Sequence, residues 1–143
     1  TRCLSDWSSD VCSSDLEEME RMLVEIGDAI EKKDIERLVE TDTRFHEVLF
    51  RASRNERLTQ ILNLLREQIQ RFRMRTLSHP ARMRIALEEH RNLVEALAQR
   101  DPETARRVAQ EHIESAENSL MALISGEAEL GQEKPEKKDQ GSH

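Results

Sequence analysis

The 143-residue sequence has few aromatic residues, glycines and prolines. Aromatics make up 3%, and there are four glycines and three prolines, whereas charged residues make up 36%. So few helix breakers among so many helix formers predict an all-α domain, and no stretch alternates as a strand would. No run approaches the roughly 18 apolar residues of a membrane span, so we expect no membrane partner.

Cysteine is scarce too, because Cys3 and Cys12 are the only two. Both lie near the N-terminus, so the rest of the chain has no thiol for a disulfide or a cysteine–metal site. This is compatible with the reducing cytoplasm, where we expect the protein. The net charge is −7, and no helix face gathers basic residues without acids between them. Because this negative net charge repels the phosphate backbone of DNA, we do not expect the chain alone to bind DNA.

Residues 1–16, TRCLSDWSSDVCSSDL, differ in composition from everything that follows. A secretory signal is excluded, because it needs a basic end and about 7 to 15 apolar residues. A natural leader is one alternative, but the string resembles the translation of a common sequencing adaptor. We therefore predict a non-native leader, and we expect residues 1–15 to pack against nothing specific. One domain would span residues 17–126, and residues 127–143 would form a disordered tail with little to bury.

Apolar periodicity in the domain predicts five helices. Three of the expected helices are directly preceded by a residue type that is a good N-cap, namely Asp34, Asn55 and Asp101. The SHP break at residues 78–80 precedes the fourth helix, and proline suits the first turn of the fourth and fifth helices. The predicted helices begin near Leu16, Ile35, Glu56, Pro80 and Pro102.

Polar residues interrupt three of the apolar helix faces, whereas the face over residues 58–72 is wholly apolar. Asp42 and His46 lie one turn apart on the second helix, His90 on the fourth and His112 on the fifth. We expect all four side chains to point into the bundle. A buried carboxylate needs a partner, and three imidazoles with one carboxylate suit a divalent metal, zinc first, with nickel or manganese also compatible. A buried Asp–His network without metal is the alternative.

Three segments, DTRFHEVLFRASRNERL, EEHRNLVEALAQRDPETA and EHI, resemble the FCD ligand-binding domain of GntR-family bacterial transcription regulators. The resemblance covers residues 17–124 and places the family's metal-binding pattern on Asp42, His46, His90 and His112. It implies an antiparallel helical bundle that senses a small carboxylate, an organic or sugar acid, with the help of a metal. It also implies a homodimeric full-length regulator that is not an enzyme and grips DNA through an N-terminal winged helix-turn-helix.

The sequence departs from this family pattern upstream. We expect both the winged helix-turn-helix and the family's first effector-domain helix to be missing. Arg73, Arg75 and Arg82 lie near the junction of the third and fourth helices, where their planar guanidinium groups could pair with a carboxylate of the effector or be solvated. Two other functions stay open: a metal-dependent enzyme, although its usual helical motifs are lacking, and a structural bundle without metal.

Overall fold

The computed structural model describes residues 11–126, where the chain forms helices and no strand. The predicted all-α bundle is therefore confirmed, while the expected disordered tail over residues 127–143 lies outside the described range. Among the helices described, none is long and apolar enough to cross a membrane. The helices are α1 (Ser13–Glu31), α2 (Ile35–Ala52), α3 (Glu56–Leu64), α4 (Arg66–Leu77), α5 (Pro80–Ala98) and α6 (Pro102–Ser125).

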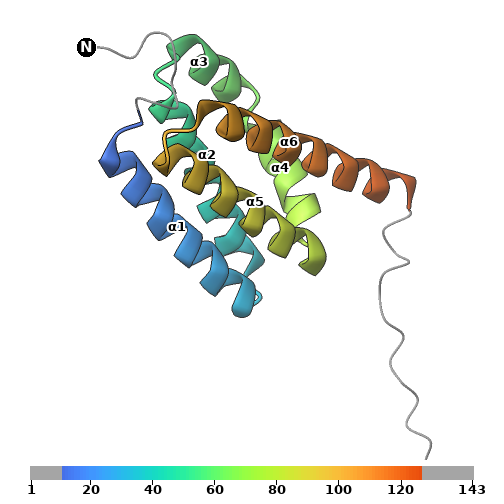
Figure 1. Cartoon of the computed structure of the whole chain (residues 1–143). Helices are drawn as coiled ribbons and strands as arrows, with labels where there is room; N and C mark the ends of the chain where they lie inside the picture. Colours follow the sequence, from blue (N-terminus) through green and yellow to red (C-terminus); the bar gives the residue numbers. More distant parts are fainter. Residues whose placement is uncertain (1–10, 127–143) are drawn as a thin grey trace, which may run out of the picture.

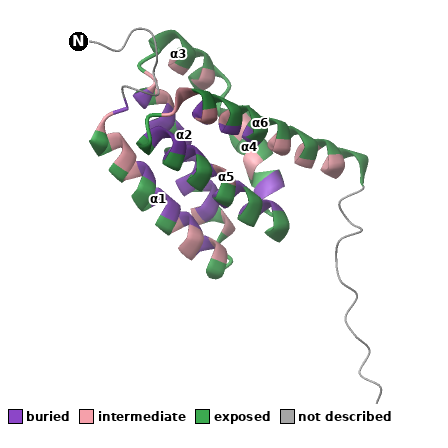
Figure 2. Ribbon diagram, in the orientation of Figure 1, coloured by how far each residue is buried: buried purple, intermediate pink, exposed green. Residues whose placement is uncertain are grey.

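Helices α1, α2 and α5 lie side by side and hold most of the core (Figure 1). α1 contacts both α2 and α5, and α6 packs along α5. Figure 2 shows buried residues following the facing sides of these helices. We call α1, α2 and α5 the packed layer. Its largest fully buried apolar side chains are Met19, Ile26, Leu38, Phe45, Leu93 and Leu97.

Three of the helix junctions share one local structure. Lys33, Arg54 and Arg100 have positive φ angles of 55°, 51° and 56°. The left-handed residue ends one helix, and the side chain of the next residue caps the following helix by accepting a backbone N–H. These caps and first-turn prolines confirm the predicted boundaries, at Asp34, Asn55, Pro80, Asp101 and Pro102.

The single helix predicted between Asn55 and the SHP break is wrong, because two helices, α3 and α4, meet at Leu65. No proline or glycine marks this break. The Leu65 N–H lies 3.3 Å from the Ile61 carbonyl and 3.2 Å from that of Leu62, as at a tightened helix end. The break lets α4 pack against α2 and α6, while α3 contacts only α2 and α4 among the major helix pairs. Tertiary packing rather than a local breaker therefore divides the helix.

The expectation that residues 1–15 pack against nothing specific is wrong for the described part of that segment. Val11 is only 1% exposed and belongs to the hydrophobic core. α1 also begins earlier than predicted, and Asp15 near its start forms an ion pair with Arg51 at 3.3 Å. One apolar side chain can be buried without any apolar period around it. Residues 1–10 lie outside the described range.

Candidate metal and effector site

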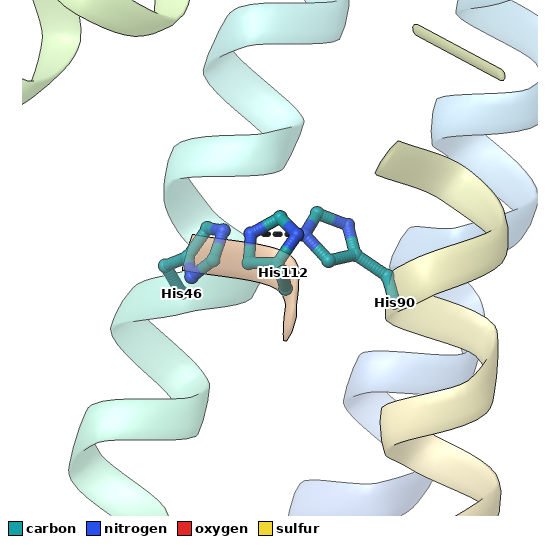
Figure 3. A group of neighbouring side chains, drawn as sticks. All are labelled: His46, His90 and His112. Atoms are coloured by element: carbon teal, nitrogen blue, oxygen red, sulfur yellow. Dashed lines mark hydrogen bonds between the residues drawn. The ribbon is translucent and has the colours of Figure 1, made fainter. Parts of the chain in front are cut away.

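Three histidines from three helices meet in the interior. His46 on α2, His90 on α5 and His112 on α6 are all buried, and their rings lie next to one another (Figure 3). One ligand atom from each lies within 4.8 Å of those of the other two. His90 Nε2 and His112 Nε2 are 3.4 Å apart. The expected inward orientation of the three imidazoles is thus confirmed.

Asp42 is buried beside this group, as the sequence predicts, but its nearest ionic partner is an arginine. The Asp42 carboxylate lies 3.8 Å from His46 Nε2 and 3.7 Å from His90 Nδ1. Arg73 Nε, from α4, lies closer, 3.2 Å from Asp42 Oδ2. Burial raises the pKa of Asp42, and the charge of Arg73 opposes that rise. The buried carboxylate therefore has a cationic partner in this structure without any metal.

The electrostatics of the site keep its imidazoles able to bind a metal. Burial lowers the pKa of His46 and of His90 well below the usual 6.5, and the charge of Arg73 lowers both further. Neutral imidazole carries the lone pair that a metal needs. His112 Nδ1 lies 2.6 Å from Glu89 Oε2, so this nitrogen donates to the carboxylate and leaves Nε2 free to accept.

The three imidazoles are close enough to share a divalent ion, whereas Asp42 lies beside this group and is not part of it. The 3.4 Å between His90 Nε2 and His112 Nε2 is long for a hydrogen bond. It is close to the roughly 3.3 Å expected between two nitrogens that each lie about 2.0–2.1 Å from a tetrahedral zinc. With Nε2 on the ion, His90 Nδ1 would carry the proton; this atom has no hydrogen-bond partner among residues 11–126, and the Asp42 carboxylate lies 3.7 Å from it. Imidazole and carboxylate suit zinc, and they do not discriminate against nickel or manganese.

Glu89 joins the histidine group to Arg82, a connection that the sequence analysis missed. Arg82 is 5% exposed, and its Nη1 donates to both oxygens of Glu89 at 3.0 and 3.1 Å and to Ser115 Oγ at 2.8 Å. Burial by itself would raise the pKa of Glu89, but the hydrogen bonds from His112 and Ser115 and the charge of Arg82 outweigh it and lower that pKa. The one signal in the sequence is the seven-residue spacing of Arg82 and Glu89, which puts both on one helix face.

A cavity of about 1110 Å³ opens beside these groups. Asp42, His46, His112, Arg73 and Arg82 line it, and we call this part of the wall the polar end. Much of the remaining wall comes from the wholly apolar face of α3 and α4. This face is not part of the buried core, because no residue of α3 is buried and the α4 ring of Phe72 is 50% exposed.

The structure brings two of the three predicted effector-binding arginines to this cavity. Arg73 and Arg82 line it, and each is held by a carboxylate, Asp42 and Glu89 respectively. Arg75 is exposed on α4 and does not line the cavity. The cavity therefore has two guanidinium groups in one wall.

The sequence model of the FCD domain matches residues 3–115, most of the chain. The chain belongs to the FCD domain family. FCD domains are regulatory ligand-binding domains, and the matched region contains every residue of the polar end. The resemblance inferred from the sequence is thus confirmed, although the match begins inside the segment expected to be a leader. No curated protein was found to match this FCD domain.

Proposed function

We propose that this FCD domain is the effector-sensing part of a GntR-family bacterial transcription regulator. Asp42, His46, His90 and His112 would hold a divalent metal, zinc first, with nickel or manganese as alternatives. The metal would anchor the carboxylate of a small organic or sugar acid. The observation that carries this proposal is the convergence of three buried imidazoles, from three helices, beside a cavity of about 1110 Å³.

The chain's own residues orient the effector. Glu89 and Ser115 hold Arg82 at the polar end, and Asp42 and Thr43 hold Arg73 there. A guanidinium group offers a planar pair of donors that matches a carboxylate. A bound metal supplies a Lewis acid with open coordination positions for the same carboxylate. The polar end therefore suits an anion.

The histidines link the effector to the rest of the regulator. Because they come from α2, α5 and α6, a ligand held by them ties three helices together. Effector binding would then shift the population between DNA-competent and DNA-incompetent homodimers. DNA itself would be gripped by a separate winged helix-turn-helix domain, and the regulator would act in the cytoplasm.

Metal binding is the first test. The purified chain should bind about one zinc ion, and zinc at 100 times its Kd should raise the free energy of unfolding by about 2.7 kcal/mol. Single substitutions of the predicted ligands should weaken or abolish that gain, and His79→Gln, on a half-buried histidine outside the group, is the control. The variants are Asp42→Asn, His46→Gln, His90→Gln and His112→Gln. A parent chain that gains no stability from zinc, nickel or manganese would leave the Asp–His network without metal as the better description.

Carboxylate binding is the second test. Acetate and gluconate should bind the zinc-loaded chain more tightly than the chelator-treated chain in calorimetry. Equal affinity in both forms would show that the metal does not anchor the effector. The same mixtures distinguish a sensor from a metal-dependent enzyme, because a sensor returns its ligand chemically unchanged. Turnover of either acid would overturn the sensing function.

A further inference from the structure

The cavity is much larger than the head group of a small acid. Its volume of about 1110 Å³ would hold roughly 35 water molecules at about 30 Å³ each. Beyond the polar end, apolar side chains from α2, α3, α4 and α6 line it. Six of them are Leu49, Leu62, Ile69, Phe72, Ile113 and Leu120.

Building on the function proposed above, we infer that the effector is a carboxylate with an extended apolar chain or ring. The polar end would take the carboxylate, and the apolar wall would take the chain. This narrows the proposed effectors from organic and sugar acids to organic acids with a large apolar part. The argument rests on the charges of the polar end and on the composition of the wall.

The charges of the polar end call for an anion. Arg73 is paired with Asp42 at 3.2 Å, and Arg82 with Glu89 at 3.0 Å, so these four charges cancel. A divalent metal on the histidines would leave an excess positive charge in a buried site, which a carboxylate compensates. A carboxylate entering from the cavity supplies the compensating negative charge.

The wall beyond the polar end favours an apolar chain over hydroxyl groups. Beyond the polar end the wall is mostly apolar, with polar side chains such as Ser53, Asn55 and Thr76 among its residues. Most hydroxyls of a sugar acid would therefore lose water against leucine, isoleucine and phenylalanine without gaining a hydrogen-bond partner. A hydrocarbon chain instead removes exposed apolar surface from water, since Phe72 is 50% and Ile113 62% exposed. The same surface is continuous with the anion-binding end, so its occupant has to be both anionic and apolar.

A homologous series of acids measures this preference. Straight-chain monocarboxylates from acetate to octanoate are titrated into the zinc-loaded full chain, with gluconate as the polar comparison. Each buried methylene should tighten binding by about fourfold. Because the last methylenes are only partly buried, octanoate should bind about 100-fold tighter than acetate overall.

Two leucines on α3 provide a matched pair of variants. Leu62 lines the cavity, whereas Leu64, two residues later, is 85% exposed and does not line it. Leu62→Gln should weaken octanoate binding roughly tenfold and leave acetate binding unchanged. Leu64→Gln should leave both affinities unchanged. An equal loss of octanoate affinity in both variants would indicate that the hydrocarbon chain adsorbs non-specifically to the protein, and would overturn the inference.

The remaining outcomes separate this inference from the proposed function. Metal-dependent binding of acetate and gluconate with no gain along the series would overturn the apolar effector and keep the carboxylate sensor. Failure of every acid to bind the zinc-loaded chain would overturn the sensor itself. A second copy of the protein is the competing partner for the apolar wall of the cavity. A ligand-free dimer that Leu62→Gln dissociates, together with a flat series, would overturn the inference in favour of that copy.

Discussion

The packed layer and the helix pair α3 and α4 are built from similar apolar residues but bury them very differently. In the packed layer Phe45 is fully buried and stacks on the His90 ring at 4.4 Å. On α4 the equivalent aromatic, Phe72, is 50% exposed and faces the cavity. We use the name cavity wall for α3 and α4 alone, because these two helices carry much of the apolar lining of the cavity. The packed layer positions Asp42, His46 and His90, and the cavity wall supplies surface for a ligand.

If the proposed function is correct, this difference divides stability from ligand recognition within one small bundle. Residues that hold a metal must stay within a few tenths of an ångström of their geometry, which close packing provides. A surface that accepts a ligand has to leave apolar area uncovered until the ligand arrives. The four predictions below test this division, starting with the largest effect.

Removing an aromatic ring from each region should give the largest difference between the two regions in the free energy of unfolding. Phe45→Ala should lower the free energy of unfolding by about 3–5 kcal/mol, because it empties the core beside His90. Phe72→Ala should cost less than about 1 kcal/mol, since the ring is already half in water. Urea unfolding of both variants measures the difference. Equal losses would show that the cavity wall is as much a part of the core as the packed layer.

Glu89, on α5 of the packed layer, bonds to His112 and to Arg82, and both of these side chains line the cavity. Glu89→Gln should weaken metal binding about 10- to 100-fold, since it removes the charge that orients His112. Glu88→Gln is the matched control, because Glu88 is exposed and pairs with Arg91 on the surface. Competition with a coloured chelator measures both affinities. A similar loss for the two variants would mean that general surface charge, and not this contact, tunes the site.

Acidification should weaken the packed layer through its histidines. Because burial lowers the pKa of His46 and His90 below 6.5, only the unfolded chain takes up their protons as the pH falls past that value. Their contribution to stability is therefore present above pH 6.5 and lost below it. From about pH 7.5 to about pH 6 the metal-free chain should lose roughly 1 to 2 kcal/mol, and His46→Gln about half as much. Identical losses in chemical unfolding would contradict this assignment.

The smallest effect concerns the junction between two helices of the packed layer. Lys33 has a φ of 55°, which an L side chain adopts at a cost. Lys33→Gly should raise the free energy of unfolding by up to about 1 kcal/mol, since glycine adopts this angle freely. The neighbouring Lys32 has a φ of −80°, so Lys32→Gly should lower the free energy of unfolding. Thermal unfolding of both variants measures the two effects. Stabilisation by both substitutions would show that the angle is not the cause.

Local chemistry was enough to predict the helical class, the capped junctions and the inward-facing histidines. An Asp or Asn cap needs only the N–H groups that follow it, and a polar residue on an apolar stripe turns inward with that stripe. The assignment to the FCD family also rested on the sequence pattern. Metal binding by this site and the origin of residues 1–16 remain predictions.

Only the tertiary structure decided which apolar surface is core and which lines a cavity. The stripe over residues 58–72 looks the same as that of a core helix, because periodicity records which side chains share a face and not what covers that face. The break at Leu65, the burial of Val11 and the pairing of Arg73 with Asp42 likewise depend on contacts between distant segments. Such contacts follow from how whole helices pack, and no spacing along the chain encodes them.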